Sequence, residues 1–310
     1  MTELQTTRIG LPTGVTLKVA LGGPEGAEPI VFLHGFPESH RTWRHQLHTL
    51  ERDFYVVAPD QRGFGGSDKP EAIEDYRTEK AVADLIALAD ALRLPSFTLV
   101  GHDWGGAASW LAAFKHPNRI KRLIIVNAPH PLVFQRSLID DEAQRAASQY
   151  MNAFRQPGFE KAIAAMGYQT FFEKSFSPHV DLRLISEAEH DAYLHDWSQP
   201  GAMAAMLNWY RASNIEVPEI GAKAHKPIWT MSPLFPTPKM PVLVIWGLRD
   251  KALLPSQLDN LNLLVPDLRI VVERDAGHFI PWEKPEVVTA AIRDFVAETS
   301  ATTNDPSPRT

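Results

Sequence analysis

Two sequence patterns alternate along the first 130 residues, and this alternation constrains the fold more than any other feature of the chain. Short apolar or β-branched runs, bounded by Gly, Pro, Asn or Asp, are typical of strands. Such runs occupy residues 15–21, 30–33, 55–58, 97–100 and 123–126. The later runs are apolar throughout, and unbroken apolar strands are expected where helices cover both faces of a parallel sheet.

Between these runs the apolar residues recur at the 3.6-residue period of a helix face. One such face, between the third and fourth runs, is formed by Val82, Leu85, Ile86, Ala89 and Leu92. A second helix is expected from Trp104 through an Ala-rich stretch to His116, where Pro117 stops it. Strands and helices in alternation predict a doubly wound α/β fold.

The strand pattern disappears between residues 130 and 238, where helical, aromatic-rich sequence takes over. A helical segment of this length needs a hydrophobic face against which to pack, so we expect an inserted helical cap. A Pro-rich stretch from Pro227 to Pro241 marks the return of the chain from this cap.

The α/β pattern resumes after residue 238. Strands are expected at 242–246 and 269–272, and helices at 257–264 and 285–297. We therefore predict one α/β core domain, made of residues 1–129 and 239–300, which a cap domain at 130–238 interrupts. The final residues, 301–310, are polar and are expected to form a disordered tail.

Composition excludes several classes of function. The 31 Lys and Arg residues against 37 Asp and Glu give a formal net charge of −6, which disfavours binding to nucleic acid. The absence of Cys removes disulfides, thiolate nucleophiles and Cys-ligated zinc. No stretch of about 18 apolar residues occurs, so we expect a soluble, cytoplasmic protein without a membrane span.

The sequence GHDWGG at residues 101–106 lies between the fourth apolar run and the second expected helix. Glycines around a central residue at such a junction are typical of a nucleophile elbow, a sharp turn that exposes one side chain above the sheet. That position holds Asp103 and no Ser, which disfavours a serine esterase. A carboxylate that attacks a saturated carbon forms a stable alkyl ester, and water must then hydrolyse the ester with the help of a base.

Two further residues stand where this chemistry needs a base and its partner. Asp250 follows the expected strand at 242–246, and His278 follows the next expected strand. The order nucleophile, acid, histidine is the order that accompanies this elbow. We therefore expect Asp250 to orient the imidazole of His278, which deprotonates the attacking water.

Hydrolysis of an ester on Asp103 creates an oxyanion, which requires preorganised N–H donors. The sequence HGFPES at residues 34–39 follows the second apolar run and offers the backbone N–H of Phe36. The elbow itself offers the backbone N–H of Trp104. These two groups are the expected oxyanion hole.

Three motifs resemble those of the aspartate-nucleophile α/β-hydrolases, and within them most of all those of the epoxide hydrolases: HGFPES at 34–39, GHDWGG at 101–106 and NAPHP at 127–131. The segments of Asp250 and His278 extend the match through nearly the whole chain. The resemblance implies an α/β-hydrolase fold with a mostly parallel eight-stranded sheet, covering helices and an inserted helical cap. It also implies that the protein uses no metal and no organic cofactor.

The resemblance extends to two tyrosines of the cap, Tyr150 and Tyr210, which match the residues that hydrogen-bond the epoxide oxygen in epoxide hydrolases. A phenol has a pKa of about 10 and is a proton donor at neutral pH, so it suits a leaving alkoxide. The resemblance also implies substrate contacts by Pro37, His130 and Trp209. The expected reaction is hydrolysis of an epoxide to a vicinal diol through a covalent ester on the elbow aspartate.

The motif GHDWGG is shared with haloalkane dehalogenases, which leaves a second interpretation open. In that interpretation Asp103 displaces a halide that the indole of Trp104 holds. A second indole would come from Trp197, Trp209 or Trp229. A third interpretation is a catalytically silent binding protein with the same fold.

The Met and aromatic residues of the expected cap indicate a small-molecule epoxide with apolar or aryl bulk as the substrate, with water as the second reactant. We expect neither a nucleic acid nor a membrane among the partners. The sequence leaves the oligomeric state open between a monomer and a homodimer.

Overall fold

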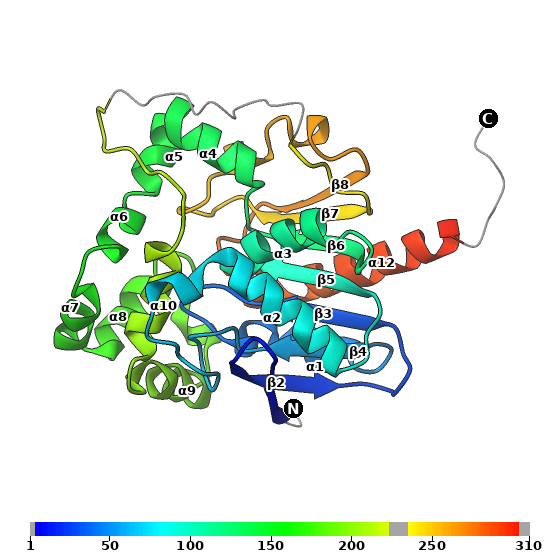
Figure 1. The fold of residues 1–310 in the computed structure, drawn as a ribbon. Coiled ribbons are helices and arrows are strands. Elements are labelled where there is room, and N and C mark those ends of the chain that lie inside the picture. Colours follow the sequence, from blue (N-terminus) through cyan, green and yellow to red (C-terminus); the bar gives the residue numbers. More distant parts are fainter. Residues whose placement is uncertain (1–3, 223–234, 304–310) are drawn as a thin grey trace.

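The computed structural model describes residues 4–222 and 235–303 (Figure 1). Within these residues eight strands form one sheet, in the order β1-β2-β4-β3-β5-β6-β7-β8. The strand β2 is antiparallel to its two neighbours, and the other pairs are parallel. The strands are β1 Gln5–Gly10, β2 Thr16–Gly22, β3 Pro29–Leu33, β4 Tyr55–Pro59, β5 Phe97–His102, β6 Ile120–Val126, β7 Val242–Gly247 and β8 Leu268–Glu273. This sheet confirms the predicted fold class.

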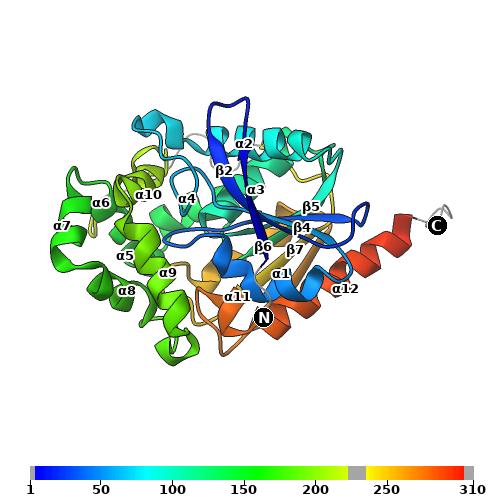
Figure 2. The same cartoon turned by 90° about the horizontal axis from the view of Figure 1, so that it is seen from below.

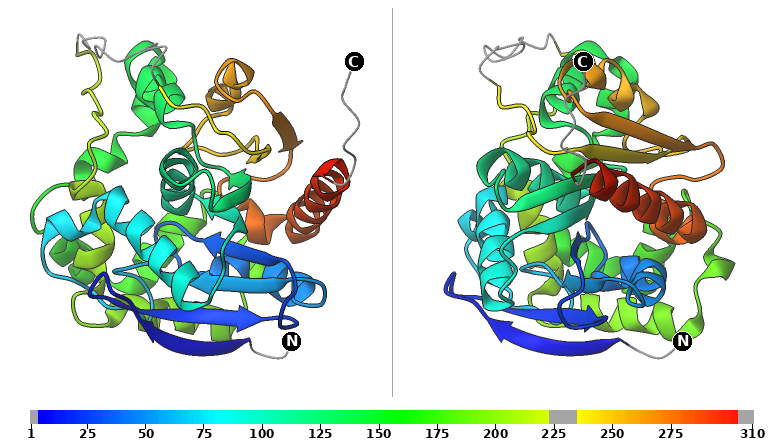
Figure 3. Two further views of the ribbon diagram at one scale, coloured as in Figure 1. Left: turned by 45° about the vertical axis from the view of Figure 1, so that its right-hand side comes forward. Right: turned by 90° about the vertical axis from the view of Figure 1, so that its right-hand side faces the viewer.

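Helices cover both faces of the sheet. Helices α2 and α3 lie on one face, and α1, α11 and α12 lie on the other (Figure 2). Two further views show β1 at one edge of the sheet and β8 at the opposite edge (Figure 3). These helices are α1 Arg44–Leu50, α2 Thr78–Ala91, α3 Trp104–Lys115, α11 Ile280–Glu283 and α12 Pro285–Thr303.

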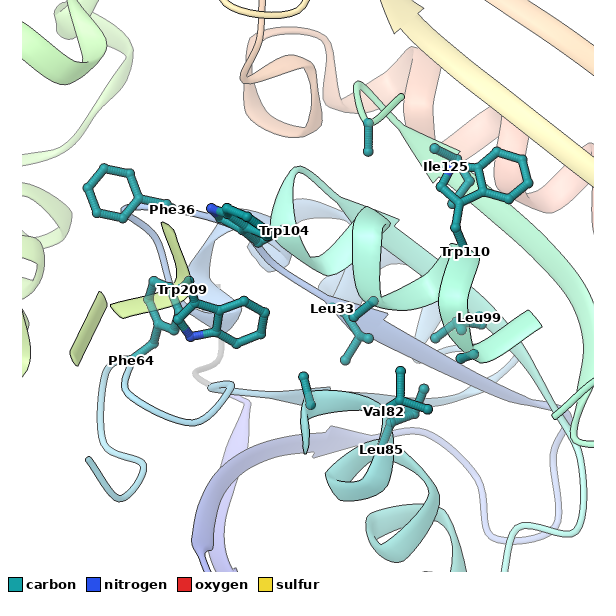
Figure 4. Packing of buried hydrophobic residues seen from close by; sticks show 14 of the residues in the cluster. Leu33, Phe36, Phe64, Val82, Leu85, Leu99, Trp104, Trp110, Ile125 and Trp209 are labelled. Atoms are coloured by element: carbon teal, nitrogen blue, oxygen red, sulfur yellow. The ribbon is translucent and has the colours of Figure 1, made fainter. Parts of the chain in front are cut away.

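Side chains of the central strands alternate between two hydrophobic clusters, one on each face. In β3, Ile30 and Phe32 join the cluster on the side of α1 and α12. Val31 and Leu33 join the cluster on the side of α2 and α3, where Leu33 lies near Val82 (Figure 4). Because helices bury both faces, strands such as β3 and β7 are apolar throughout. Each large buried side chain contributes about 1.5–3 kcal/mol of burial free energy.

Two elements differ from those predicted. The strand β1 was not expected, because it is an exposed edge strand of sequence QTTRIG in which only Ile9 is partly buried. The segment 257–264 does not form one helix but contributes to two short 3-10 helices, η4 Pro255–Leu258 and η5 Leu261–Leu263. Between them Asn260 adopts a φ of 59°, which interrupts any helical path.

The C-terminal helix is longer than predicted. It extends to Thr303, so residues 301–303 are helical and do not belong to a disordered tail. The buried guanidinium of Arg122 donates hydrogen bonds to the hydroxyl groups of Thr299 and Ser300, which anchors the end of the helix. Residues 304–310 lie outside the described residues.

Between β6 and β7 the described residues form helices and no strand, as predicted. We call helices α4 to α10 the cap; they lie at the carboxyl end of the parallel strands (Figure 1). They are α4 Pro131–Asp140, α5 Glu142–Ala147, α6 Tyr150–Phe154, α7 Phe159–Met166, α8 Tyr168–Phe176, α9 Glu187–Ser198 and α10 Ala202–Arg211. Buried cap residues such as Met151 and Phe171 belong to the same hydrophobic cluster as α2 and α3. The division into a core domain and a cap domain stays a prediction.

The Pro-rich stretch from 227 to 241 lies largely outside the described residues, as does Trp229. Its described end, residues 235–241, leads into β7. Among residues 4–222 and 235–303, no helix combines the length and apolar character that a membrane crossing requires.

Candidate active site

Asp103 stands at the sharp turn between β5 and α3. Its backbone has φ 51° and ψ −121°, a combination that residues other than glycine rarely adopt. Neighbouring glycines make the turn possible. A Cβ at Gly105 would lie 2.3 Å from the carbonyl oxygen of Leu33, and one at Gly35 would lie 2.2 Å from Oδ1 of Asp103. The elbow thereby presents the carboxylate at the carboxyl end of the sheet.

Two backbone N–H groups hold the carboxylate of Asp103. The N–H of Phe36 donates to Oδ1 over 2.8 Å, and the N–H of Trp104 also donates to this carboxylate. These are the two donors that the sequence predicts for the oxyanion hole. The second carboxylate oxygen, Oδ2, lies 3.7 Å from Nε2 of His278. One oxygen is therefore fixed by the backbone while the other faces the histidine.

The acid and the histidine lie together beside the nucleophile. Nδ1 of His278 is 2.7 Å from Oδ2 of Asp250. The backbone N–H groups of Ala252 and Leu253 donate to Oδ1 of Asp250 over 2.8 and 2.9 Å. Nδ2 of Asn127 donates to Oδ2 of the same carboxylate over 2.7 Å. The carboxylate of Asp250 is thus bound at both oxygens and fixes the imidazole in one orientation.

Electrostatics of the site favour a charged histidine at rest. Burial alone lowers the pKa of His278, but the carboxylates of Asp250 and Asp103, and more weakly Glu38, raise it to about 9. The pKa of Asp250 is lowered, because His278 and the N–H donors outweigh its burial. Burial raises the pKa of Asp103, and His278 opposes that rise. At neutral pH His278 therefore carries a proton beside the carboxylate of Asp250.

Tyr150 from α6 and Tyr210 from α10 line the same two cavities as Asp103. Their ring centroids are 6.0 Å apart, with an interplanar angle of 79°. Burial raises the pKa of both phenols above the usual value of about 10. The charge of Asp103 adds to the rise at Tyr150. Both phenols therefore keep their protons at neutral pH and can act as donors.

Arg155, a residue that sequence reasoning did not single out, holds the two tyrosine helices together. It follows α6, and its Nε donates to the backbone carbonyl of Tyr210 over 3.0 Å. Its Nη2 donates to Oγ of Ser213 over 3.0 Å and to the carbonyl of Ile215 over 2.6 Å. The spacing of the two phenols is thus set by hydrogen bonds as well as by ring packing.

Two cavities meet at the nucleophile, and Asp103, Tyr150 and Tyr210 line both of them. The first has a volume of about 310 Å³, and its apolar walls include Trp104, Leu111, Phe134, Met151 and Ile215. The second has a volume of about 460 Å³, and its walls include Phe36, Pro37, Phe154, Ile163, Met166 and His278. The reacting carboxylate therefore lies between two mainly apolar compartments.

Two of the three cap indoles expected as halide ligands, those of Trp197 and Trp209, donate to backbone carbonyls. Nε1 of Trp197 donates to the backbone carbonyl of Pro37 over 2.7 Å. Nε1 of Trp209 donates to the carbonyl of Arg62 over 3.1 Å, and the ring packs against Trp104 with centroids 6.0 Å apart. Among the described residues, the walls of the two cavities include Pro37 but not Trp209. Trp209 therefore packs against Trp104 and is not among the described residues that line the two cavities.

His130 also differs from its expected place as a substrate contact. It caps α4, where its Nδ1 accepts a hydrogen bond from the N–H of Leu132. Its ring packs against Trp110 and Phe114, with centroids 4.9 and 5.7 Å apart. Within the described residues, its neighbour Pro129 lines the first cavity and His130 does not. The motif NAPHP thus contributes a helix cap at this position.

Two further groups were missed by sequence reasoning. Asn127 supports Asp250, and its position directly after β6 at the carboxyl edge of the sheet was the available signal. Glu38 is buried in the oxyanion loop, accepts hydrogen bonds from Thr42 and from Tyr193 of α9, and has a pKa raised by burial to about 7. Within residues 4–222 and 235–303, no three His, Asp or Glu side chains are grouped so that they could hold a metal ion.

Comparison with known proteins agrees with this geometry. A family model described as alpha/beta hydrolase fold matches residues 28–285. The AB hydrolase superfamily protein YfhM of Bacillus subtilis is 33% identical over 91% of this chain and 95% of its own. A solved structure described among novel epoxide hydrolases in metagenomes from hot environments has a TM-score of 0.88 and 42% identity, covering 95% of this chain and 99% of that chain.

A second solved structure is a mutant epoxide hydrolase from Bacillus megaterium in complex with its product, (R)-3-[1]naphthyloxy-propane-1,2-diol. It has a TM-score of 0.84 and 30% identity, and covers 94% of this chain and 100% of that chain. The chain described here belongs to the α/β-hydrolase fold family. The structures to which it is similar confirm the resemblance to epoxide hydrolases that its motifs indicate.

Proposed function

We propose that this protein is an epoxide hydrolase that converts an apolar or aryl epoxide to a vicinal diol through a covalent ester on Asp103. One observation carries the proposal: two phenols line both cavities together with the carboxylate of Asp103. An epoxide leaves as an alkoxide, which needs a proton donor, and paired phenols supply one. The similar proteins that are named epoxide hydrolases support the same reaction.

In the first step Oδ2 of Asp103 attacks an epoxide carbon, while Oδ1 stays bound to the N–H of Phe36. A bond forms between Oδ2 and this carbon, and the bond between the carbon and the epoxide oxygen breaks. The oxygen takes a proton from Tyr150 or Tyr210, and the phenolate later regains a proton from solvent. The product of this step is a hydroxyalkyl ester of Asp103.

In the second step His278 takes a proton from water, and the hydroxide attacks the carbonyl carbon of the ester. The negative charge develops on Oδ1, which already accepts from the N–H of Phe36, and the N–H of Trp104 donates to the same carboxyl group. One such donor is worth about 2.7–4 kcal/mol in the transition state. The bond between the acyl carbon and the alkyl oxygen then breaks, and the diol leaves with a proton from His278. The carboxylic acid of Asp103 that remains releases its proton to solvent, which restores the carboxylate.

The charge of Asp103 links the two steps. In the resting site that charge helps to raise the pKa of His278. Once Asp103 is an uncharged ester this contribution disappears, so His278 loses its proton more readily and becomes a base. The charge of Asp103 thus helps to keep the proton on His278 before attack, and its loss activates the histidine when water is needed.

A haloalkane dehalogenase would need indole donors for the departing halide. Two of the three candidate cap indoles, those of Trp197 and Trp209, donate to backbone carbonyls, and Trp229 lies outside the described residues. Phenol donors suit an alkoxide better than a halide ion, which needs no proton. The complete arrangement of Asp103, Asp250 and His278 likewise supports an active enzyme over a silent binding protein.

The test is a parallel assay of the purified protein on styrene oxide and on a 1-haloalkane, following diol and halide. We expect diol from the epoxide and no halide from the haloalkane. Halide release without diol would replace the proposal with the dehalogenase interpretation. Neither product, from a folded protein across a panel of aryl and alkyl epoxides, would favour the silent binding protein.

A further inference from the structure

A buried amide of the cap contacts the loop that carries the catalytic acid. Gln144 of α5 is 0% exposed. Its Nε2 donates to the carbonyl of Ala252 over 2.8 Å, and its Oε1 accepts from the N–H of Leu254 over 2.8 Å. One side chain therefore binds the backbone of residues 252–254 through both ends of its amide.

The same stretch of backbone binds Asp250 from its other side. The N–H groups of Ala252 and Leu253 donate to Oδ1 of Asp250, whose Oδ2 orients His278. Within residues 252–254, two backbone N–H groups therefore bind Asp250, and one carbonyl and one N–H bind the amide of Gln144. A displacement of this backbone changes the position of the acid.

The amide of Gln144 is itself held in one orientation. Its Nε2 also donates to Oγ of Ser148 over 2.9 Å, and its Oε1 also accepts from Nε2 of Gln257 over 3.1 Å. Nε2 of Gln257 in turn donates to Oγ of Ser137 over 2.8 Å. All the polar atoms of the Gln144 amide have partners, so the network fixes the side chain.

We infer that Gln144 is a positioning residue for ester hydrolysis, which acts from the cap by holding residues 250–254 so that Asp250 keeps His278 aligned. Gln144 lies outside the residues that line the two cavities in the described part of the chain, so it acts through the loop and not on the substrate. The inference rests on the proposed function, because its effect is on the second chemical step.

This role predicts a selective defect. Asp103 is held by Phe36 and Trp104, and the phenols are held by the α6 and α10 contacts, so the groups that act in the attack are held by contacts outside residues 250–254. Removing the Gln144 amide should therefore slow hydrolysis of the ester while leaving its formation nearly unchanged.

The test is Gln144→Met, which keeps the length of the side chain and removes its hydrogen bonds. Rapid mixing of excess enzyme with styrene oxide gives the rates of ester formation and ester hydrolysis separately. We expect hydrolysis to slow about 10- to 100-fold, as for a small misplacement of a catalytic group, and formation to stay within about twofold. The low-field proton resonance of His278 Nδ1–H should also shift or broaden.

Gln46→Met is the matched control. Gln46 is also 0% exposed and donates from Nε2 to the carbonyl of Pro281 over 2.7 Å, but it makes no hydrogen bond to residues 250–254. We expect both of its rates to stay near those of the unmodified protein. If Gln144→Met does not fold, Gln257→Met removes one donor to the same amide and should give a smaller loss in the same step.

The outcomes separate the two proposals. No ester in the unmodified protein would overturn the proposed function. Ester formation with unchanged hydrolysis in folded Gln144→Met would overturn only the role of Gln144. An equal slowing of hydrolysis in Gln144→Met and Gln46→Met would also overturn it, because the effect would then reflect the general loss of a buried hydrogen bond.

Discussion

In the core, hydrogen bonds hold Asp103 and Asp250, whereas in the cap aromatic packing acts together with the hydrogen bonds of Arg155 to place the phenols. Asp103 and Asp250 accept backbone N–H groups at distances of 2.8 to 2.9 Å. Tyr210 instead packs against Phe36, Trp104 and Phe154, with ring centroids 5.0 to 5.2 Å away. Hydrogen bonds from backbone N–H groups fix the positions of the charged carboxylate oxygens. Ring packing places a neutral phenol among apolar side chains.

The two regions also differ in charge. The core half contains carboxylates and an imidazolium, and the cap half contains phenols whose pKa values lie above their usual range. In the proposed mechanism the core carries out nucleophilic attack and ester hydrolysis, and the cap protonates the leaving oxygen. Variants in the two regions should therefore fail at different steps.

The largest expected effect is that of Asp103→Ala. Without the carboxylate neither step can begin, and we expect the rate of diol formation to fall by about 10⁴-fold or more. Intact-mass measurement after mixing with styrene oxide should show no added mass. A covalent adduct elsewhere on this variant, with diol still forming, would contradict the assignment of the nucleophile.

In the core, His278→Gln should separate the steps. The variant retains Asp103 and both phenols, so the ester forms, but water has no base, and hydrolysis should slow by about 10²–10⁴-fold. Intact mass should then show a persistent adduct on Asp103. If the variant never accumulates the adduct, His278 has a role in attack that this account does not include.

In the cap, the double variant Tyr150→Phe with Tyr210→Phe should give the opposite defect. The alkoxide loses its proton donors, so ester formation should slow by about 10²–10⁴-fold, and no adduct should accumulate. Single variants should lose less, because one phenol remains. Accumulated ester in the double variant would mean that the phenols act in ester hydrolysis. It would contradict the different roles proposed for the cap and the core.

The pH dependence of ester hydrolysis tests the proposed role of His278 in the core. The pKa of His278 is raised to about 9 in the resting site, partly by the charge of Asp103. The neutral imidazole is the base, so ester hydrolysis should rise with pH and reach a plateau. Since esterification removes the charge of Asp103, the midpoint should lie below about 9. A single-turnover profile that falls as pH rises would contradict this sign.

The smallest expected effect is that of Trp197→Phe, which removes a hydrogen bond between the cap and the core. Trp197 of α9 donates to the carbonyl of Pro37, next to the oxyanion donor Phe36. Loss of one neutral hydrogen bond is worth about 0.5–1.5 kcal/mol, or a change of about 2- to 12-fold. We expect this change in hydrolysis and not in ester formation, measured by rapid mixing. An equal change in both steps would point to a general loosening of the cap.

The core half of the site could be predicted from the sequence because its residues follow strands. Asp103, Asp250 and His278 each stand after a predicted strand, and parallel strands bring their carboxyl ends to one edge. The alternation of apolar runs likewise predicted the sheet. The exposed edge strand β1 carries no such pattern and was missed.

The cap half could be predicted only where a motif marks it. Tyr150 and Tyr210 were found through the resemblance, whereas Arg155 and Gln144 act by contacts between segments far apart in the sequence. His130 and Trp209 sit within matching motifs, yet their side chains make a helix cap and a packing contact. Residue type and spacing do not reveal which way such side chains point.

The most direct test of the covalent route is a single turnover in oxygen-18 water with enzyme in excess over styrene oxide. If Asp103 attacks the epoxide, the oxygen added to the diol comes from the carboxylate, and water replaces that oxygen in the protein. We predict an unlabelled diol and one labelled oxygen in the peptide that contains Asp103. Label in the diol and none in Asp103 would mean that water attacks the epoxide directly, which would contradict the central claim.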